Sequence, residues 1–185
     1  MKKTPVLLLA GFVAMMSCFV ACDKNDTPVQ PVVLTLYDSL GGTTLVTDPT
    51  NPSMKIEQGR LGIRSVVDST IFVIAADTAI NSYFTVLLSE VTVGNLSGFQ
   101  DLSNELTNFF CVATGAKNFM YTGLNMVDAH DPAKNSRMNG KAGNDDFDAF
   151  VADLVAGAQQ NALPDYLIAR VGALVETLRT QVVQQ

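Results

Sequence analysis

Clusters of positive charge are almost absent from this sequence. Charged residues make up only 16% of the chain, and the formal net charge is −6. No cluster of lysine or arginine follows Lys2 and Lys3 at the start of the chain. A protein that binds nucleic acid needs a basic face to meet the phosphates, so this class is excluded. The same shortage excludes a polybasic patch that would hold the protein on a membrane surface.

Histidine and cysteine are also scarce, and tryptophan is missing. The chain has one histidine, His130, and three cysteines, Cys18, Cys22 and Cys111. No second histidine is available to assist peroxide cleavage. There is no Gly-x-Ser-x-Gly motif of a serine hydrolase and no flavin or nicotinamide motif of a reductase. These absences disfavour several enzyme classes before any fold is considered.

The start of the chain has the composition of an export signal. Two lysines precede the apolar stretch Pro5 to Val20, which has signal-peptide length but is short for a membrane-spanning helix. It ends in Phe19-Val20-Ala21-Cys22, which resembles a bacterial lipobox with phenylalanine in place of the usual leucine. We expect Cys22 to be lipidated, and an ordinary cleaved signal is the alternative.

Three segments follow from this interpretation. Residues 1–22 would be the signal peptide, residues 23–32 a polar tether, and residues 33–185 the folded domain. Acyl chains on Cys22 would then anchor an exported lipoprotein in the periplasm or on the cell surface. Cys111 would be left alone, without an intramolecular disulfide.

The apolar residues of the domain recur with the spacing of helices, which predicts an all-α fold of about six helices and one core. Long helices are expected over Gly59–Ala76, from a Ser97/Gln100 capping box to about Thr114, from a cap at Asn144 to Asn161, and from Pro164 onward. The β-branched run at 71–74 could also form a buried strand, but its length and flanking charges favour helix. The apolar face of the first long helix comprises Leu61, Val66, Val67, Ile71, Phe72 and Ile74.

Two stretches between the predicted helices lack this apolar spacing. Thr43–Gln58, with its Asp-Pro and Asn-Pro pairs, is expected to form a loop, as is the polar stretch Asp131–Asn144. Gly41-Gly42 ends the short first segment with a left-handed turn.

His130 ends a distinctive stretch, Met120 to His130, between two of the predicted long helices. Imidazole is an adaptable hydrogen-bonding group, so the histidine could simply end a short helix, satisfied by a backbone carbonyl. It could also reach as a metal ligand into an apolar slot built by the helices. Taken alone, the residue leaves both interpretations open.

Four motifs, in order, give the chain a resemblance to group I truncated haemoglobins. Together they span about residues 33–183, and the Tyr-Thr-Gly sequence followed by a methionine and a histidine is the most specific. The motifs are Leu36-Tyr37-Asp38-Ser39-Leu40-Gly41-Gly42, then Val66 to Phe84, then Phe109-Phe110 with Tyr121-Thr122-Gly123, Met126 and Ala129-His130, and finally Asp146-Phe147-Asp148-Ala149-Phe150 with Leu154.

This resemblance implies a two-on-two helical sandwich around haem b. It implies His130 as the axial ligand of the iron and Phe84 stacked on the porphyrin, with Tyr121 also in contact with the haem. Met126, Phe147 and Phe150 would line the pocket. Haem is a flat apolar disc, so it needs facing apolar helices and one neutral imidazole to bind its iron. Asp128, Asp131 or a backbone carbonyl could orient the histidine ring.

The chain departs from that family on the distal side of the expected pocket. Ile71, Leu102 and Leu106 stand where the family usually has polar groups, and they are either plain core or an apolar distal wall. Bound O2 carries partial negative charge and normally gains from a hydrogen-bond donor. We therefore expect an apolar distal pocket that releases O2 quickly and discriminates little against CO. Thr43–Gln58 and Asp131–Asn144 are insertions relative to the family.

The expected function is binding of a diatomic gas (O2, NO or CO) by a tethered haem protein. The alternative is a globin-fold lipoprotein that has lost haem and serves as a structural or interaction module. An NO dioxygenase-like or peroxidase-like activity would need a separate reductase as redox partner, because the chain carries no reductase motif of its own.

Overall fold

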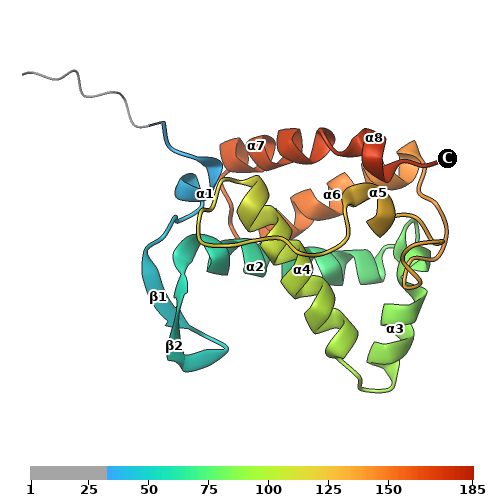
Figure 1. Ribbon diagram of the computed structural model, residues 1–185, viewed down its shortest axis with the longest axis horizontal. Coiled ribbons are helices and arrows are strands. Elements are labelled where there is room, and N and C mark those ends of the chain that lie inside the picture. The colour runs from blue at the N-terminus through green and yellow to red at the C-terminus, as the bar shows by residue number, and fades with distance from the viewer. Residues whose placement is uncertain (1–32) are drawn as a thin grey trace, which may run out of the picture. The chain divides into compact units, whose positions relative to one another are not determined.

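The computed structural model describes residues 33–185; the predicted signal, the tether and Cys22 lie outside the described residues. Within them, eight α-helices, one 3₁₀-helix and one two-stranded hairpin follow one another (Figure 1). The elements are α1 (Leu36–Ser39), β1 (Leu45–Asp48), β2 (Asn51–Glu57), α2 (Gln58–Ala76), η1 (Asn81–Phe84), α3 (Thr85–Thr92), α4 (Ser97–Ala113), α5 (Met126–Ala129), α6 (Asn144–Gln160), α7 (Asp165–Glu176) and α8 (Arg179–Val182).

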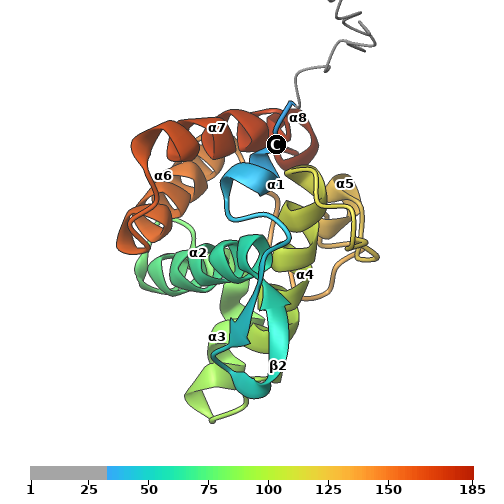
Figure 2. The same ribbon diagram turned by 90° about the vertical axis from the view of Figure 1, so that its left-hand side faces the viewer.

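Helix α2 is the centre of the packing. It lies against both α4 and α6, and α6 in turn lies against α7, so the four long helices form two paired layers (Figure 2). Its buried apolar residues Ile63, Val67, Ile71 and Ile74 recur every three or four positions, which places them on one face of the helix. The predicted all-α fold is confirmed. The buried core comprises Tyr37, Ile63, Val67, Ile71, Leu87, Phe110, Cys111, Phe147, Leu154 and Val175.

A glycine lets α2 and α6 come close together. A Cβ added at Gly157 of α6 would lie 2.8 Å from the backbone nitrogen of Thr70 and 3.0 Å from its Cα. The Thr70 hydroxyl is also held, because it donates to the carbonyl of Val66 at 2.8 Å. Since real Cβ atoms do not approach so closely, only glycine fits at this crossing.

The start of the domain turns as the sequence predicts. Gly41 and Gly42, after α1, have φ angles of 124° and 58°, which glycine adopts at no steric cost. The turn brings Tyr37 into the core, where only 1% of its surface is exposed. The Tyr37 hydroxyl donates to Glu57 Oε2 at 2.7 Å, which ties α1 to the start of α2.

The prediction that Thr43–Gln58 is a loop is wrong. Strands β1 and β2 pair antiparallel and project from the helical body (Figures 1 and 2). Pro49 lies in the tight turn of this hairpin, where Asp48 Oδ1 accepts from the backbone nitrogen of Thr50 at 2.9 Å, and Pro52 is the second residue of β2. The Arg64 guanidinium of α2 binds Asp48 at 2.9 Å. Its hydrogen bond and those from Thr50 hold the pKa of Asp48 well below its usual range.

Three local predictions are also corrected. The capping box of Ser97 and Gln100 is not formed; instead, Asn95 Oδ1 accepts from the Ser97 backbone nitrogen at 3.1 Å. Asn144 is the first residue inside α6 rather than its cap. Phe72 is 65% exposed, so it leaves the apolar face of α2.

No single helix among the described residues is long and apolar enough to cross a membrane. By length and composition, α2 taken together with the segment Asn81–Thr92 passes the same test, with a bend of 107° between them.

Candidate functional site

His130 lies directly after α5, at the end of the stretch singled out from the sequence. Its Nδ1 donates to the backbone carbonyl of Met126 at 2.8 Å, one helical turn earlier. The two aspartates considered as partners are engaged elsewhere. Asp128 accepts from the Asn125 amide at 2.7 Å, and Asp131 accepts from the backbone nitrogen of Ala133 at 3.0 Å. The histidine ring is therefore oriented by its own helix rather than by a carboxylate.

The hydrogen bond to Met126 determines which ring nitrogen of His130 could bind a metal. A carbonyl can only accept, so the bond to Met126 places the proton on Nδ1 and leaves the lone pair on Nε2. Burial lowers the pKa of His130, and the bond to the Met126 carbonyl only partly offsets this effect. A neutral imidazole with a free Nε2 lone pair is the form that ligates a metal. The carbonyl-bonded and metal-binding interpretations of His130 are therefore compatible.

The stretch before His130 lies on α4. The ring of Tyr121 packs edge-on against Phe109 with the ring centroids 5.5 Å apart. The Tyr121 hydroxyl donates to the Leu124 carbonyl at 2.6 Å, within its own loop. Burial, followed by the nearby charge of Glu105, raises the pKa of Tyr121, so the phenol stays protonated. Tyr121 thus serves as an aromatic contact between the histidine loop and α4.

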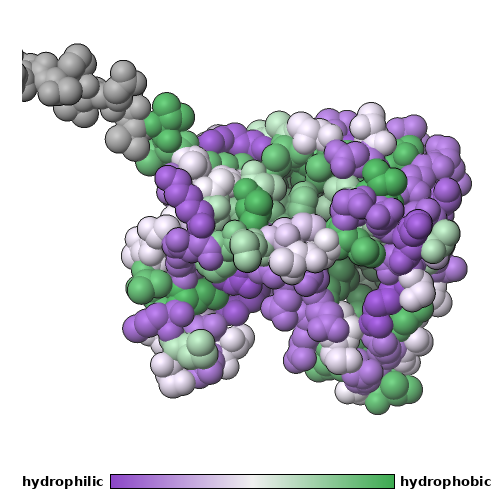
Figure 3. Space-filling view, viewed as in Figure 1, coloured by the Kyte–Doolittle hydropathy of each residue, from purple (hydrophilic) through white to green (hydrophobic). Residues whose placement is uncertain are grey.

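The apolar residues predicted to line the pocket divide into two groups by exposure. Phe84 of η1, Leu102 and Leu106 of α4 and Phe150 of α6 are half-buried hydrophobic residues at the margin of the core. Each therefore keeps an uncovered side. Met126, on α5 itself, is also half-buried. Figure 3 shows apolar side chains recessed between more polar ones over α4 and α3.

The second group of predicted pocket residues, Ile71 and Phe147, is buried. Ile71 is 4% exposed and Phe147 is 2% exposed, and both belong to the central core. The Arg179 guanidinium lies over the Phe147 ring, 4.3 Å from its centroid. The sequence did not distinguish these two residues from the half-buried group.

The loop that follows His130 is bonded to η1 and α3. Arg137 forms an ion pair with Glu90 of α3 at 2.5 Å. The backbone nitrogen of Asn139 donates to the Tyr83 carbonyl at 3.2 Å, and the Tyr83 hydroxyl donates to Asp146 at 2.7 Å. The contacts of Arg137 and Asn139 fix the predicted loop against α3 and η1, and the bond from Tyr83 to Asp146 joins η1 to α6.

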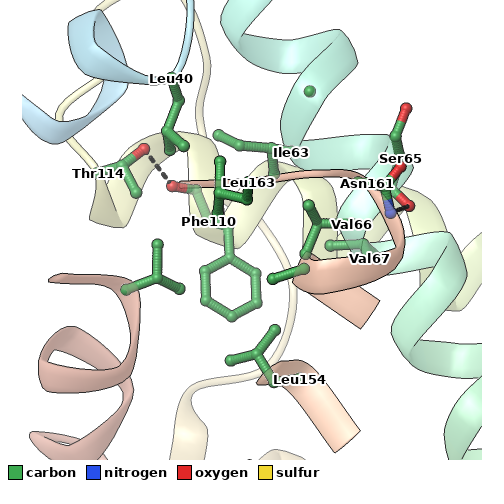
Figure 4. A pocket seen from close by; sticks show the side chains of 13 residues that line it. Leu40, Ile63, Ser65, Val66, Val67, Phe110, Thr114, Leu154, Asn161 and Leu163 are labelled. Carbon is green, nitrogen blue, oxygen red and sulfur yellow. Dashed lines mark hydrogen bonds between the residues drawn. The ribbon is translucent and has the colours of Figure 1, made fainter. Parts of the chain in front are cut away.

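A mainly apolar cavity lies away from His130. It measures about 220 Å³ and sits where α1, α2, α4, α6 and α7 meet, around Phe110 (Figure 4). None of the nine residues predicted for the site lines it. Among the described residues, no three His, Cys, Asp or Glu side chains gather as they would to hold a metal ion directly. A metal at His130 would therefore need most of its ligands from a cofactor.

Two residues that support this site were not predicted from the sequence. The Asn135 amide donates to the Ala129 carbonyl at 2.8 Å, and the Gln184 amide donates to the Val127 carbonyl at 2.7 Å. Asn125, which accepts from the Asp128 backbone nitrogen at 3.0 Å, caps α5 at its other end.

Comparison with known proteins locates the fold. No protein-family model matches the chain, and no curated protein matches it in sequence. Solved structures do match, among them the truncated hemoglobin of Tetrahymena pyriformis in its Fe(III) form, as two different single-substitution mutants. Each has a TM-score of 0.58 and 19% identity, and the match covers 82% of this chain and 100% of that chain. The fold is that of a truncated globin.

Proposed function

We propose that this chain is a haem protein of the group I truncated haemoglobin type that binds a diatomic gas. The carrying observation is His130, a neutral imidazole whose Nδ1 is bound to the Met126 carbonyl and whose Nε2 has no hydrogen-bond partner within residues 33–185. The ordered motifs of the sequence and the truncated globin fold support the same assignment. When bound, haem supplies an iron at which O2, NO or CO can be held.

The residues of the chain fit such a group. His130 would be the axial ligand, with Phe84 against the porphyrin and Met126, Tyr121 and Phe150 around it. Their uncovered apolar sides suit a flat apolar cofactor. No Cys-x-x-Cys-His motif is present, which favours haem b without covalent attachment. Phe147, covered by Arg179, would support Phe150 from behind, since their rings are 6.3 Å apart.

On the gas-binding side the chain offers Leu102 and Leu106 of α4, backed by Ile71 of α2. None of these side chains can donate a hydrogen bond. The pocket would therefore hold O2, NO and CO by apolar contact, release O2 quickly and discriminate little against CO.

A visible spectrum tests this proposal. The full chain, purified in detergent and mixed with hemin, should show a Soret band that shifts with reductant and with CO. His130→Ala should abolish that band, whereas Met126→Leu, an apolar replacement of similar volume, should preserve it. A wild-type protein without a Soret shift, or a shift that survives in His130→Ala, would refute the proposal.

A folded protein that takes up no hemin would instead favour the alternative, a globin-fold module that has lost haem. The close burial of Ile71 and Phe147 is the observation on its side, because these two side chains are already covered without a cofactor. Circular dichroism of the same preparation separates this outcome from simple unfolding.

We also propose that the domain is exported and anchored through a lipid on Cys22. The lipobox-like end of residues 1–22 and the polar segment 23–32 support this. Labelling of cells with radioactive palmitate should mark the wild type and Cys18→Ser but not Cys22→Ser. Equal labelling of both cysteine variants would contradict the anchor.

A further inference from the structure

Helix α5 is too short to hold His130 in place by itself. It has four residues, whereas isolated helices need ~12–15 residues to be even marginally stable in water. Its orientation must therefore come from groups outside the helix. Asn125 caps its first turn. The carbonyls of the last turn need donors of their own.

Two of those carbonyls accept hydrogen bonds from side-chain amides that lie later in the chain, those of Asn135 and Gln184. The Val127 carbonyl accepts from the His130 backbone nitrogen at 3.3 Å and from Gln184 Nε2 at 2.7 Å. The Ala129 carbonyl accepts from Asn135 Nδ2 at 2.8 Å. The Met126 carbonyl is used by the His130 ring itself. Of the two outside donors, Gln184 is the one that comes from the far end of the domain.

Gln184 is itself fixed. Its backbone nitrogen donates to the Ala142 carbonyl at 3.0 Å, next to a parallel bridge between Ala142 and Val183. Ala142 is buried and lies just before α6. The preceding helix, α8, packs directly against α5. Gln184 thus links Ala142, just before α6, to the Val127 carbonyl of α5.

We infer that Gln184 is a positioning residue for His130: its backbone is anchored to Ala142 and its side-chain amide sets the orientation of α5. This inference rests on the proposed function for its significance, because His130 is the proposed haem ligand. The geometry of the imidazole, however, can be read without haem.

The histidine is well suited to this test because it is the only one in the chain. In the full-length protein produced without a histidine tag, nitrogen-15 NMR of the imidazole reports its tautomer without ambiguity. The wild type should show the proton on Nδ1, as the bond to the Met126 carbonyl requires. Gln184→Glu keeps the shape but removes the donor, and Gln184→Met removes the donor without adding charge.

Both variants should shift the ratio of the two tautomers toward the Nε2-protonated form by between about twofold and tenfold, as expected for loss of one hydrogen bond. Gln184→Lys, which keeps a donor, should restore the wild-type signal. Gln185→Glu is the matched control, because it adds the same charge to the neighbouring exposed glutamine. The inference is overturned if all four variants match the wild type, or if Gln185→Glu changes the signal as much as Gln184→Glu.

A second measurement uses the haem-loaded protein. In Gln184→Glu and Gln184→Met, the iron–histidine vibration of the reduced protein should shift, and haem should dissociate about two- to tenfold faster. Gln184→Lys and Gln185→Glu should behave as the wild type. If the wild type takes up no haem, the proposed function fails, and the tautomer measurement still decides the role of Gln184.

Discussion

Replacing Gly157 by alanine tests the close approach of α2 and α6 on which the fold depends. The added methyl group would meet Thr70 at its backbone nitrogen, its Cα and its hydroxyl oxygen. Thr70 cannot turn away, because its hydroxyl is bonded to Val66 and its backbone belongs to the central helix. The two helices must therefore separate by roughly half an ångström to restore ordinary van der Waals contact, which forfeits part of the dispersion energy across the interface.

The size of the effect follows from two opposing contributions. Overpacking a dense core costs about 1–3 kcal/mol, and a backbone neighbour belongs at the upper end. Alanine regains about 0.5–1 kcal/mol relative to glycine inside a helix. The net loss should be roughly 2 kcal/mol in the free energy of unfolding, which lowers Tm by about 4–8 °C for a domain of this size.

Gly172 of α7 provides the control for the same substitution. No atom lies within 4 Å of the position that its Cβ would occupy, so Gly172→Ala should gain the helix preference without a clash. It should stabilise the protein by about 0.5–1 kcal/mol. Urea unfolding of both variants, followed by circular dichroism, measures the two values. A Gly157→Ala protein as stable as Gly172→Ala would refute the close crossing of α2 and α6.

Four further predictions follow from single groups. Because Arg64 and Thr50 lower the pKa of Asp48 in the folded state, its contribution to stability is present above about pH 4 and lost as the pH falls further; Asp48→Asn should flatten this acid loss in urea titrations. Because burial lowers the pKa of His130, the unfolded apoprotein gains a proton first, and stability should fall as the pH drops below about 6.5; His130→Gln should remove that fall between pH 7 and 5. Burial raises the pKa of Asp153, whose Oδ2 lacks a partner among the described residues, so the folded state is penalised as the pH rises above about 4; Asp153→Asn should add about 1 kcal/mol at pH 7 and little at pH 3. In the haem-loaded protein, Leu106→Gln should slow O2 release about tenfold by adding one donor, measured by stopped-flow mixing; unchanged release would contradict an apolar gas site.

The long helices could be predicted because their signal is local. The apolar spacing placed the first long helix at Gly59–Ala76, and α2 spans Gln58–Ala76. Gly41 and Gly42 likewise predicted a left-handed turn from residue type alone. Such features depend on neighbours three or four positions away, which the sequence displays directly.

The hairpin could not be predicted in the same way. Its two Xaa-Pro pairs are typical of loops, but Pro49 lies in the tight turn between β1 and β2, and Pro52 lies within β2, an edge strand in which proline is tolerated. Whether the flanking residues pair depends on contacts across the chain, such as the ion pair of Asp48 with Arg64. The exposure of Phe72 has a similar origin, because α2 has more apolar positions than its neighbours cover.

The sequence predicts the central residue of the site, His130, but not the residues that hold α5 in place. His130 stands out in the sequence as the only histidine, and a backbone carbonyl is one of the partners that the sequence leaves open for it. The choice of Met126 over the nearby aspartates depends on how α5 ends, which the sequence does not display. Gln184 lies 57 residues from Val127 in sequence, and no spacing rule links a glutamine to a carbonyl at that distance.

The distal positions show why residue type alone left their role open. Ile71, Leu102 and Leu106 are all apolar, so composition cannot separate core from pocket wall. Their surroundings do: Ile71 is 4% exposed inside the central cluster, whereas the two leucines are half-buried at its margin. A group that already has neighbours on every side has no free surface to offer a ligand. A gas molecule would therefore meet the α4 leucines first, which is why Leu106 rather than Ile71 is the position at which a new donor should change release.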